Sequence, residues 1–228
     1  MQVTLTDAPG DYEAVYIDVQ DIKINTTTDS SGGWTSLDNV HRGTYNLLEL
    51  VNGNDTLLSD ATIPAGRVQQ IRLVLGSENF VKIDGQMIKL QTPSAQQSGL
   101  KLNIHQDVAE GITYKLLLDF DVAKSINETG NGKYVLKPTI RTIMQAVGGS
   151  IKGVVTPEYV QTSVLAIQGA DTVASTYSLN GGYIIKGLNA GTYDLHFLPT
   201  DSTLGTQVKT GVSVSTGKLT LVDTVRLN

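Results

Sequence analysis

The chain has 228 residues, of which 40% are hydrophobic and 17% charged; its formal net charge is −5 and it has no cysteine. This composition predicts a chain that folds around a hydrophobic core, and the length suits two domains of roughly 100 residues. The acidic balance and the scattered basic residues exclude the electrostatic footprint of a nucleic-acid-binding protein, and the missing cysteines exclude disulfides, thiolate metal sites and cysteine nucleophiles.

The sequence contains no run that approaches the roughly 18 apolar residues of a membrane span. It begins with Met1-Gln2 and passes directly into a strand-like pattern, without the basic and then apolar segment of a signal peptide. For an exported protein we would expect a leader and a lipid-bearing cysteine ahead of this sequence, with Met1 as an added start codon. Any contact with a membrane would then be made only through that N-terminal lipid anchor.

The first turn predicted along the chain is the segment DAPGDYEA at residues 7–14, which lies between two alternating, strand-like runs. Pro9-Gly10 suits the centre of a type II turn if Gly10 takes a positive φ. Asp7 and Asp11 flank this chain reversal, where short carboxylates commonly accept backbone N–H bonds. We interpret the segment as a structural turn, and ligand binding by Asp7 and Asp11 is the alternative.

Apolar residues with a period of two dominate the chain and predict strands. Between residues 13 and 25 the apolar positions change from odd to even near Gln20-Asp21, which predicts a β-bulge. Asp84-Gly85 lies between two alternating arms at residues 80–90 and predicts a hairpin with a type I′ turn. Only residues 121–126 suit a helix, of one or two turns. Because no long helix is available to cover a sheet, the sheets must cover each other.

The alternation lapses at AVGGS, residues 146–150, and restarts in SIKGVV. The two adjacent glycines permit a hinge, and about 80 residues remain, which is enough for one small sandwich. We therefore predict an all-β chain of two tandem β-sandwich domains, immunoglobulin-like or transthyretin-like, over residues 1–146 and 147–228. A tight turn inside one larger sandwich is the alternative. The segments GTYNL at 43–47 and GTYDL at 191–195 each predict a glycine turn followed by an inward tyrosine, a common device of such folds.

Four oxygen-bearing side chains in residues 119–128 could bind a hard cation such as calcium: Asp119, Asp121, Asn127 and Glu128. Asp121 also stands where an N-cap of the short helix would be, with Lys124 as the third helical residue. We favour the capping role, and we expect no cofactor.

Trp34 is the best candidate for an exposed aromatic platform on which a surface glycan could stack, and a half-buried strand tryptophan is the alternative. The histidines, His41, His105 and His196, lack the paired spacing that places two imidazoles on one metal. We find no nucleophile with a neighbouring base, so we predict no catalytic residues.

The second half of the chain resembles the carboxypeptidase regulatory-like family, a seven-stranded, transthyretin-like sandwich. The residues that carry the resemblance are Gly153-Val154-Val155 and the run GGYIIKGLNAGTYDL at 181–195. The match covers about 149–228. The resemblance implies a structural or interaction module, frequent in exported bacterial proteins, and brings no catalytic residues.

The first half resembles the family catalogued as domain of unknown function 4382, which is typical of exported bacterial lipoproteins. The matching segments span about 3–142 in the expected order: LTDAPGDY followed by AVYIDV, then Trp34, GTYNLL at 43–48, PAG at 64–66, SGLKLN at 98–103, and LDFDVAKSI with GNGKYVLKP. The resemblance implies an envelope location and no assigned activity.

The sequence therefore predicts a non-enzymatic, exported protein of the bacterial outer membrane, cell surface or periplasm that acts as a structural, adhesive or protein-interaction module. It would offer loops or sheet edges to a protein partner, including strand addition at an exposed edge. Capture of a carbohydrate or small ligand at the cell surface is the alternative, and a hydrolase is the least supported class.

Overall fold

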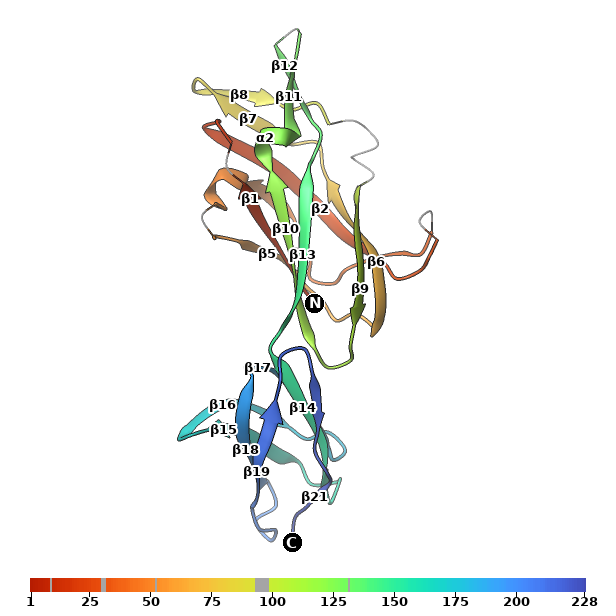
Figure 1. The fold of residues 1–228 in the computed structure, drawn as a ribbon, viewed down its shortest axis with the longest axis vertical. Helices are drawn as coiled ribbons and strands as arrows, with labels where there is room; N and C mark the ends of the chain where they lie inside the picture. Colours follow the sequence, from red (N-terminus) through yellow and green to blue (C-terminus); the bar gives the residue numbers. More distant parts are fainter. Residues whose placement is uncertain (9, 30–31, 52, 93–98, 131) are drawn as a thin grey trace. The chain divides into compact units, whose positions relative to one another are not determined.

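The computed structural model describes residues 1–8, 10–29, 32–51, 53–92, 99–130 and 132–228 (Figure 1). The chain divides into two units, one of Met1–Val108 with Tyr114–Gln145 and the other of Ala109–Thr113 with Ala146–Asn228. Nearly all regular structure is β-strand, arranged in several open sheets, which confirms the prediction of an all-β, sandwich architecture. Among the described residues, no helix has the length and apolar character to cross a membrane.

Two sheets form the first unit. The first has the order β13-β10-β1-β5, and β1 runs parallel to β10 and antiparallel to β5. Its strands are β1 (Gln2–Ala8), β5 (Thr56–Asp60), β10 (Thr113–Asp121) and β13 (Ile140–Val147). The second has the order β8-β7-β2-β6-β9, with β3 and β4 also paired to β2. Its strands are β2 (Ala14–Asn25), β3 (Trp34–Ser36), β4 (Gly43–Asn46), β6 (Gly66–Leu75), β7 (Phe80–Ile83), β8 (Gln86–Lys89) and β9 (Leu100–Val108).

Three short elements complete this unit. They are the hairpin of β11 (Ile126–Thr129) and β12 (Lys133–Leu136), the 3₁₀ helix η1 (Leu47–Glu49), and the single-turn helix α2 (Val122–Ser125). The helix predicted at 121–126 is therefore present as one turn. Asp84 and Gly85 connect β7 and β8 with φ values of 49° and 75°, as a type I′ turn requires, so the predicted hairpin is confirmed.

The core of the first unit lies between its two sheets, because alternate residues of each strand point inward. Leu5 and Phe120 from the first sheet, and Ile17 and Ile71 from the second, are fully buried in one hydrophobic cluster. The pairing of β2 with β6 shifts register between Val19 and Asp21, as the predicted bulge requires. This extra residue keeps both apolar sets of β2, odd before the bulge and even after it, on the core face.

The second unit is also a pair of facing sheets. One has the order β17-β14-β20, with β21 paired to β14, and the other has the order β16-β15-β18-β19. Their strands are β14 (Gly149–Thr156), β15 (Thr162–Gln168), β16 (Asp171–Tyr177), β17 (Gly182–Leu188), β18 (Gly191–Pro199), β19 (Gln207–Val214), β20 (Leu219–Leu221) and β21 (Val225–Arg226). Tyr183 and Phe197 meet edge to face in its core, with ring centroids 5.5 Å apart.

The two GTY segments adopt the same local geometry. The Tyr45 hydroxyl donates a 2.6 Å hydrogen bond to the His41 carbonyl, and the Tyr193 hydroxyl donates a 2.9 Å bond to the Asn189 carbonyl, four residues back in each case. This is the bond pattern of a tyrosine corner, in which a strand-entry tyrosine ties its hydroxyl to the preceding turn. The shared motif therefore reports a shared structural device of the two units.

Candidate functional site

The DAPGDY turn is bound to helix α2. Asp7 is buried, with 6% of its surface exposed, and its Oδ1 accepts a 3.2 Å hydrogen bond from the backbone N–H of Val122, the first residue of α2. A Cβ on Gly10 would lie 2.8 Å from Val122 Cγ1. This close approach to Val122 is the reason for a glycine at position 10. Gly10 does not have the positive φ that the predicted type II turn requires, so its backbone angles do not explain the glycine. Pro9 lies outside the described residues.

Asp11, the other carboxylate of this turn, is exposed. Tyr12 beside it is half-buried, and burial raises the pKa of its phenol, with smaller contributions from Tyr134, Asp11 and Glu128. The structure therefore gives Asp7 a structural partner that lies far away in the sequence, while Asp11 faces solvent. A ligand role for either carboxylate stays a prediction.

Asp121 caps helix α2, as the sequence predicted. Its Oδ1 accepts a 3.0 Å bond from the Lys124 backbone N–H, and its Oδ2 accepts a 2.6 Å bond from Lys124 Nζ. The hydrogen bonds from Lys124 lower the pKa of the Asp121 carboxyl, the side-chain bond most strongly. Asp119 has a different partner, because Arg141 donates to its Oδ2 from Nη2 at 2.6 Å and from Nε at 3.0 Å.

The other two candidate calcium ligands, Asn127 and Glu128, lie on strand β11 and are exposed. Across the described part of the chain, no group of three or more His, Cys, Asp or Glu side chains could hold a metal ion. The structure does not bring the four predicted oxygen ligands together as such a group, and two of them are occupied by cationic side chains.

Trp34 is half-buried at the start of β3. The guanidinium carbon of Arg72 lies 4.1 Å from its ring centroid, and Lys101 Nζ lies 5.9 Å away. One face of the indole is thus covered by a cation, which argues against a bare platform for a neutral sugar. The sequence pattern gave no sign of this pairing, because the three residues come from three strands and meet only through sheet register.

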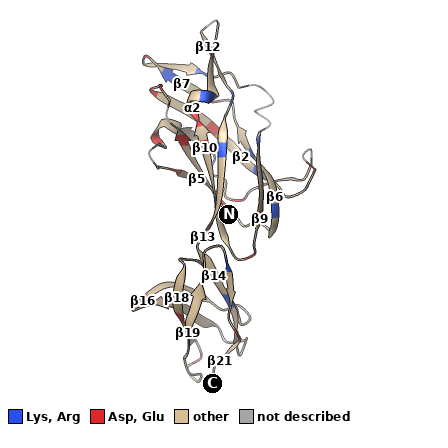
Figure 2. Cartoon of the chain, in the orientation of Figure 1, with Lys and Arg blue, Asp and Glu red and all other residues tan. Residues whose placement is uncertain are grey.

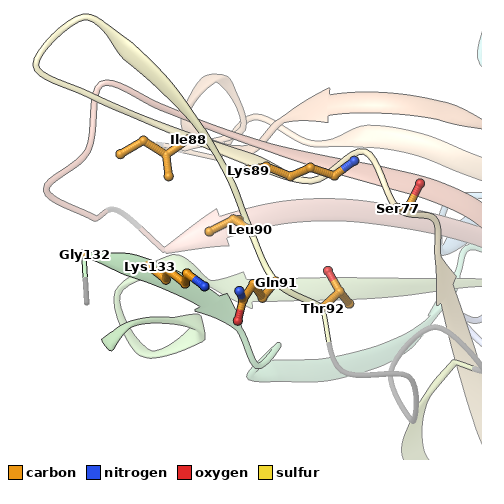
Figure 3. Close-up of a pocket in the computed structure, with 8 residues that line it drawn as sticks. All are labelled: Ser77, Ile88, Lys89, Leu90, Gln91, Thr92, Gly132 and Lys133. Atoms are coloured by element: carbon orange, nitrogen blue, oxygen red, sulfur yellow. The ribbon is translucent and has the colours of Figure 1, made fainter. Parts of the chain in front are cut away.

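A pocket of about 460 Å³ lies where β8 and the residues after it meet the start of β12 (Figure 3). In Figure 3 the Lys133 side chain extends toward Gln91, whereas Lys89 extends toward Ser77. Lys89 Nζ is paired with Glu78 Oε1 at 2.8 Å, and the pairing with Lys89 is the largest cause of the lowered pKa of Glu78. The Ser77 hydroxyl, which also lines the pocket, donates to the same Glu78 Oε1 at 2.9 Å.

A second hollow of about 460 Å³, here called the apolar groove, lies in the second unit. Its lining includes Val154 of β14, Tyr177 at the end of β16, Leu179 in the following turn and Ile184 of β17. Tyr177 is 62% exposed, Leu179 80% and Val154 37%. The sequence analysis did not predict this surface. Alternation shows which apolar residues face outward, but not which of them remain exposed to solvent in the folded protein.

Comparisons with known proteins give one family and no curated relative. The profile of the family described as "Domain of unknown function (DUF4382)" matches residues 1–138. No curated protein matches the sequence.

Three solved structures overlap the chain only weakly. They are the TIE protein of Bacillus anthracis (10% identity, TM-score 0.29), a streptococcal ancillary pilin (14%, 0.24) and the minor pilin GBS52 of Streptococcus agalactiae (10%, 0.23). The overlaps cover 95%, 100% and 99% of this chain and 35%, 62% and 94% of those structures, so the chain spans less than two thirds of the first two. At such TM-scores the superpositions carry no argument about fold or function.

Proposed function

We propose, for a chain that belongs to the family described as domain of unknown function DUF4382, a role as a non-enzymatic interaction module of the bacterial envelope. In this proposal the protein is exported, is anchored by a lipid attached ahead of the sequence, and uses its rigid sandwiches to present a surface to a protein partner. Residues 147–228 would be a carboxypeptidase regulatory-like, transthyretin-like module. The two facing sheets of the second unit support this assignment.

The observation that carries the proposal is the exposure of the apolar groove. Tyr177, Leu179 and Val154 leave much of their surface in water around one hollow. Single exposed apolar residues are ordinary, but a contiguous apolar patch on a soluble protein marks a binding surface. A partner side chain that fills the groove would remove this surface from water, at about 25 cal/mol for each Å² buried.

The strands beside the groove can also pair with a partner. β16 and β17 are the terminal strands of their sheets, so within the described residues each has one side without a neighbouring strand. An extended segment of a partner can add to such an edge through backbone hydrogen bonds, while its alternate side chains enter adjacent pockets. The groove and the open edges lie in the same part of the unit, which favours binding of an extended peptide.

The proposal is tested with the double variant Tyr177→Ser/Leu179→Ser and a matched control, Val208→Ser. Val208 is 51% exposed on β19, the terminal strand at the other end of its sheet. Each protein is coupled to beads, incubated with envelope extract of the native bacterium, and the retained proteins are measured by quantitative mass spectrometry. We expect a partner that the wild type and the control retain and that the double variant loses at least about tenfold, since two exposed apolar contacts contribute roughly 1.4 kcal/mol or more. Equal retention by all three proteins would refute the groove as the binding surface.

The envelope location is tested separately. Cells that express the natural gene with a C-terminal epitope are treated with a protease before and after the outer membrane is permeabilised. Degradation in intact cells places the protein at the cell surface, and degradation only after permeabilisation places it in the periplasm. A protein that resists the protease until the cells are lysed completely contradicts an envelope location.

A further inference from the structure

A cationic and aromatic cluster lies on the solvent face of the second sheet of the first unit, independent of the apolar groove. Lys23 of β2 is paired with Arg72 of β6, and Arg72 is paired with Lys101 of β9. Residues directly opposite one another in antiparallel strands share a face. Ile24 and Ile71, the next residues along two of these strands, are buried in the core, so the three cations point away from it. Figure 2 shows basic positions on β6 and β9.

The adjacent row supplies the aromatic ring of Trp34 and the amides of Gln70 and Asn103, with Asn25 buried between Trp34 and Gln70. Asn25 is paired on one side with Trp34 and on the other with Gln70, which is paired in turn with Asn103. Trp34 contacts the Arg72 guanidinium in a cation–π arrangement, with 4.1 Å from the guanidinium carbon to the ring centroid. The stack orients the guanidinium and limits its rotation, so less conformational entropy remains to be lost when it binds an anion.

Gly99, the residue before β9, makes room for this arrangement. A Cβ at that position would clash with Cγ and Cδ of Arg72, and the residue has a φ of 109°. The aliphatic part of the Arg72 side chain therefore packs directly against the backbone of Gly99, in space that the Cβ of any other residue would occupy. Gly99 is the glycine of the SGLKLN segment, and its contact with Arg72 explains why a glycine stands there.

Arg72 has no acceptor among the described residues, whereas three other arginines of the chain have one. Arg141 binds Asp119, Arg67 is paired with Asp107 at 3.5 Å, and Arg42 Nε donates to the Gln20 carbonyl. In the part of the chain that the structure describes, Arg72 makes no ion pair, and its Nε is buried without a hydrogen-bond partner. Lys23, which lies opposite Arg72 on β2, is 3.8 Å from the Asp21 carboxylate, whereas Arg72 has no carboxylate partner among the described residues.

The surroundings of Arg72 select the chemical class of the ligand. Gln70 Nε2 donates to Asn103 Oδ1 at 2.8 Å, and a small hollow of about 160 Å³ beside them is lined by Thr27, Thr28, Gln69, Gln70 and His105. The side chains that line the hollow are amides, hydroxyls and an imidazole, which suit the hydroxyl groups of a sugar, and the guanidinium suits a carboxylate in a two-bond geometry. We propose that Arg72, held on Trp34, anchors a binding site for an acidic saccharide whose sugar rings carry carboxylates.

Trp34 makes the site directly observable, because it is the one tryptophan of the sequence. The intact chain is titrated with oligogalacturonate and with oligomannuronate while the tryptophan fluorescence is recorded. The neutral reference is the methyl ester of the same oligogalacturonate, and a single-stranded oligonucleotide of equal charge is the polyanion reference. We expect a saturable fluorescence change with at least one acidic saccharide, binding about 10- to 100-fold weaker for the ester, and no saturable change with the oligonucleotide.

Three variants separate a positioned guanidinium from general positive charge. Arg72→Gln is expected to weaken binding about 10- to 100-fold, and Arg72→Lys is expected to weaken it nearly as much, because an ammonium cannot form the planar two-bond contact. Arg67→Gln, which removes an exposed arginine of the same strand, is expected to bind like the wild type. Thermal unfolding of each variant confirms that it is folded. Unchanged binding by Arg72→Gln, equal binding of acid and ester, equal binding of the oligonucleotide, or no saturable change with either acidic saccharide would each overturn the proposal.

Discussion

Replacement of Asp7 by alanine tests the structural reason for the DAPGDY turn. The substitution removes the buried carboxylate that accepts the Val122 N–H at 3.2 Å and leaves that N–H without an acceptor at the start of α2. A hydrogen bond to a charged group contributes about 1.5–3 kcal/mol, and an orphaned buried donor costs a similar amount, so we expect a loss of about 2–3 kcal/mol in the free energy of unfolding. For a unit of this size the melting temperature should fall by roughly 6–9 °C.

The assay is thermal unfolding followed by tryptophan fluorescence. Trp34 belongs to the first unit, so its signal reports on that unit even when the two units unfold separately. The matched control is Asp11→Ala, which removes an exposed carboxylate from the same turn and should change stability by less than about 0.5 kcal/mol. A surface substitution changes the melting temperature by about 1–2 °C. If the melting temperatures of Asp7→Ala and Asp11→Ala differ by no more than this, the turn is not held in place by its bond to α2, and the reasoning is refuted.

Tyr183→Phe removes a buried hydroxyl that has no hydrogen-bond partner in the described structure, so we expect the variant to unfold within about 1 kcal/mol of the wild type or to be more stable, by chemical denaturation. Burial raises the pKa of Tyr183 from 10.0 to about 12, so between these pH values the folded state keeps a proton that the unfolded state has lost. The contribution of this group to stability is complete below pH 10 and is lost as the pH rises toward 12. Tyr183→Phe should therefore lose less free energy of unfolding than the wild type as the pH is raised. Gly153→Ala places a Cβ 2.5 Å from the Tyr183 hydroxyl oxygen and should cost about 1–3 kcal/mol in the same denaturation experiment; a neutral effect would show that the ring moves freely. Calcium should not shift the melting temperature of the wild type, because Asp119 and Asp121 are held by cationic side chains; a concentration-dependent increase would contradict this.

Local pattern predicted the elements whose cause is local. The phase change near Gln20-Asp21 required an extra residue on one strand, and the structure has the register shift there. Asp84-Gly85 required positive φ at two successive positions, which fixes a two-residue hairpin. Asp121 capped a helix that could be recognised from the residues around it. In each case the physical requirement acts over fewer than about five residues, so the sequence states it directly.

The expectation for Gly10 was wrong for the opposite reason. A glycine after proline suits a type II turn, but here the requirement is the absence of a side chain against Val122, which lies more than a hundred residues away. Trp34 shows the same limit. The sequence marked it as a candidate site residue, and only the pairing of β2 with β3 and of β2 with β6 revealed that Arg72 covers its ring.

The sequence by itself determined that this chain is all-β, that a bulge and a type I′ turn interrupt its strands, and that its first half has the segments of the DUF4382 family. These properties follow from residue periodicity, from the backbone angles that glycine and aspartate allow, and from the order of short segments. Only the tertiary structure decided which apolar residues stay in water at the apolar groove, which carboxylate of the DAPGDY turn is buried, and that the arginine stacked on Trp34 has no acceptor among the described residues. Burial and charge pairing depend on which residues become neighbours when the strands pair. The register of that pairing is set by contacts between residues that are far apart in the sequence.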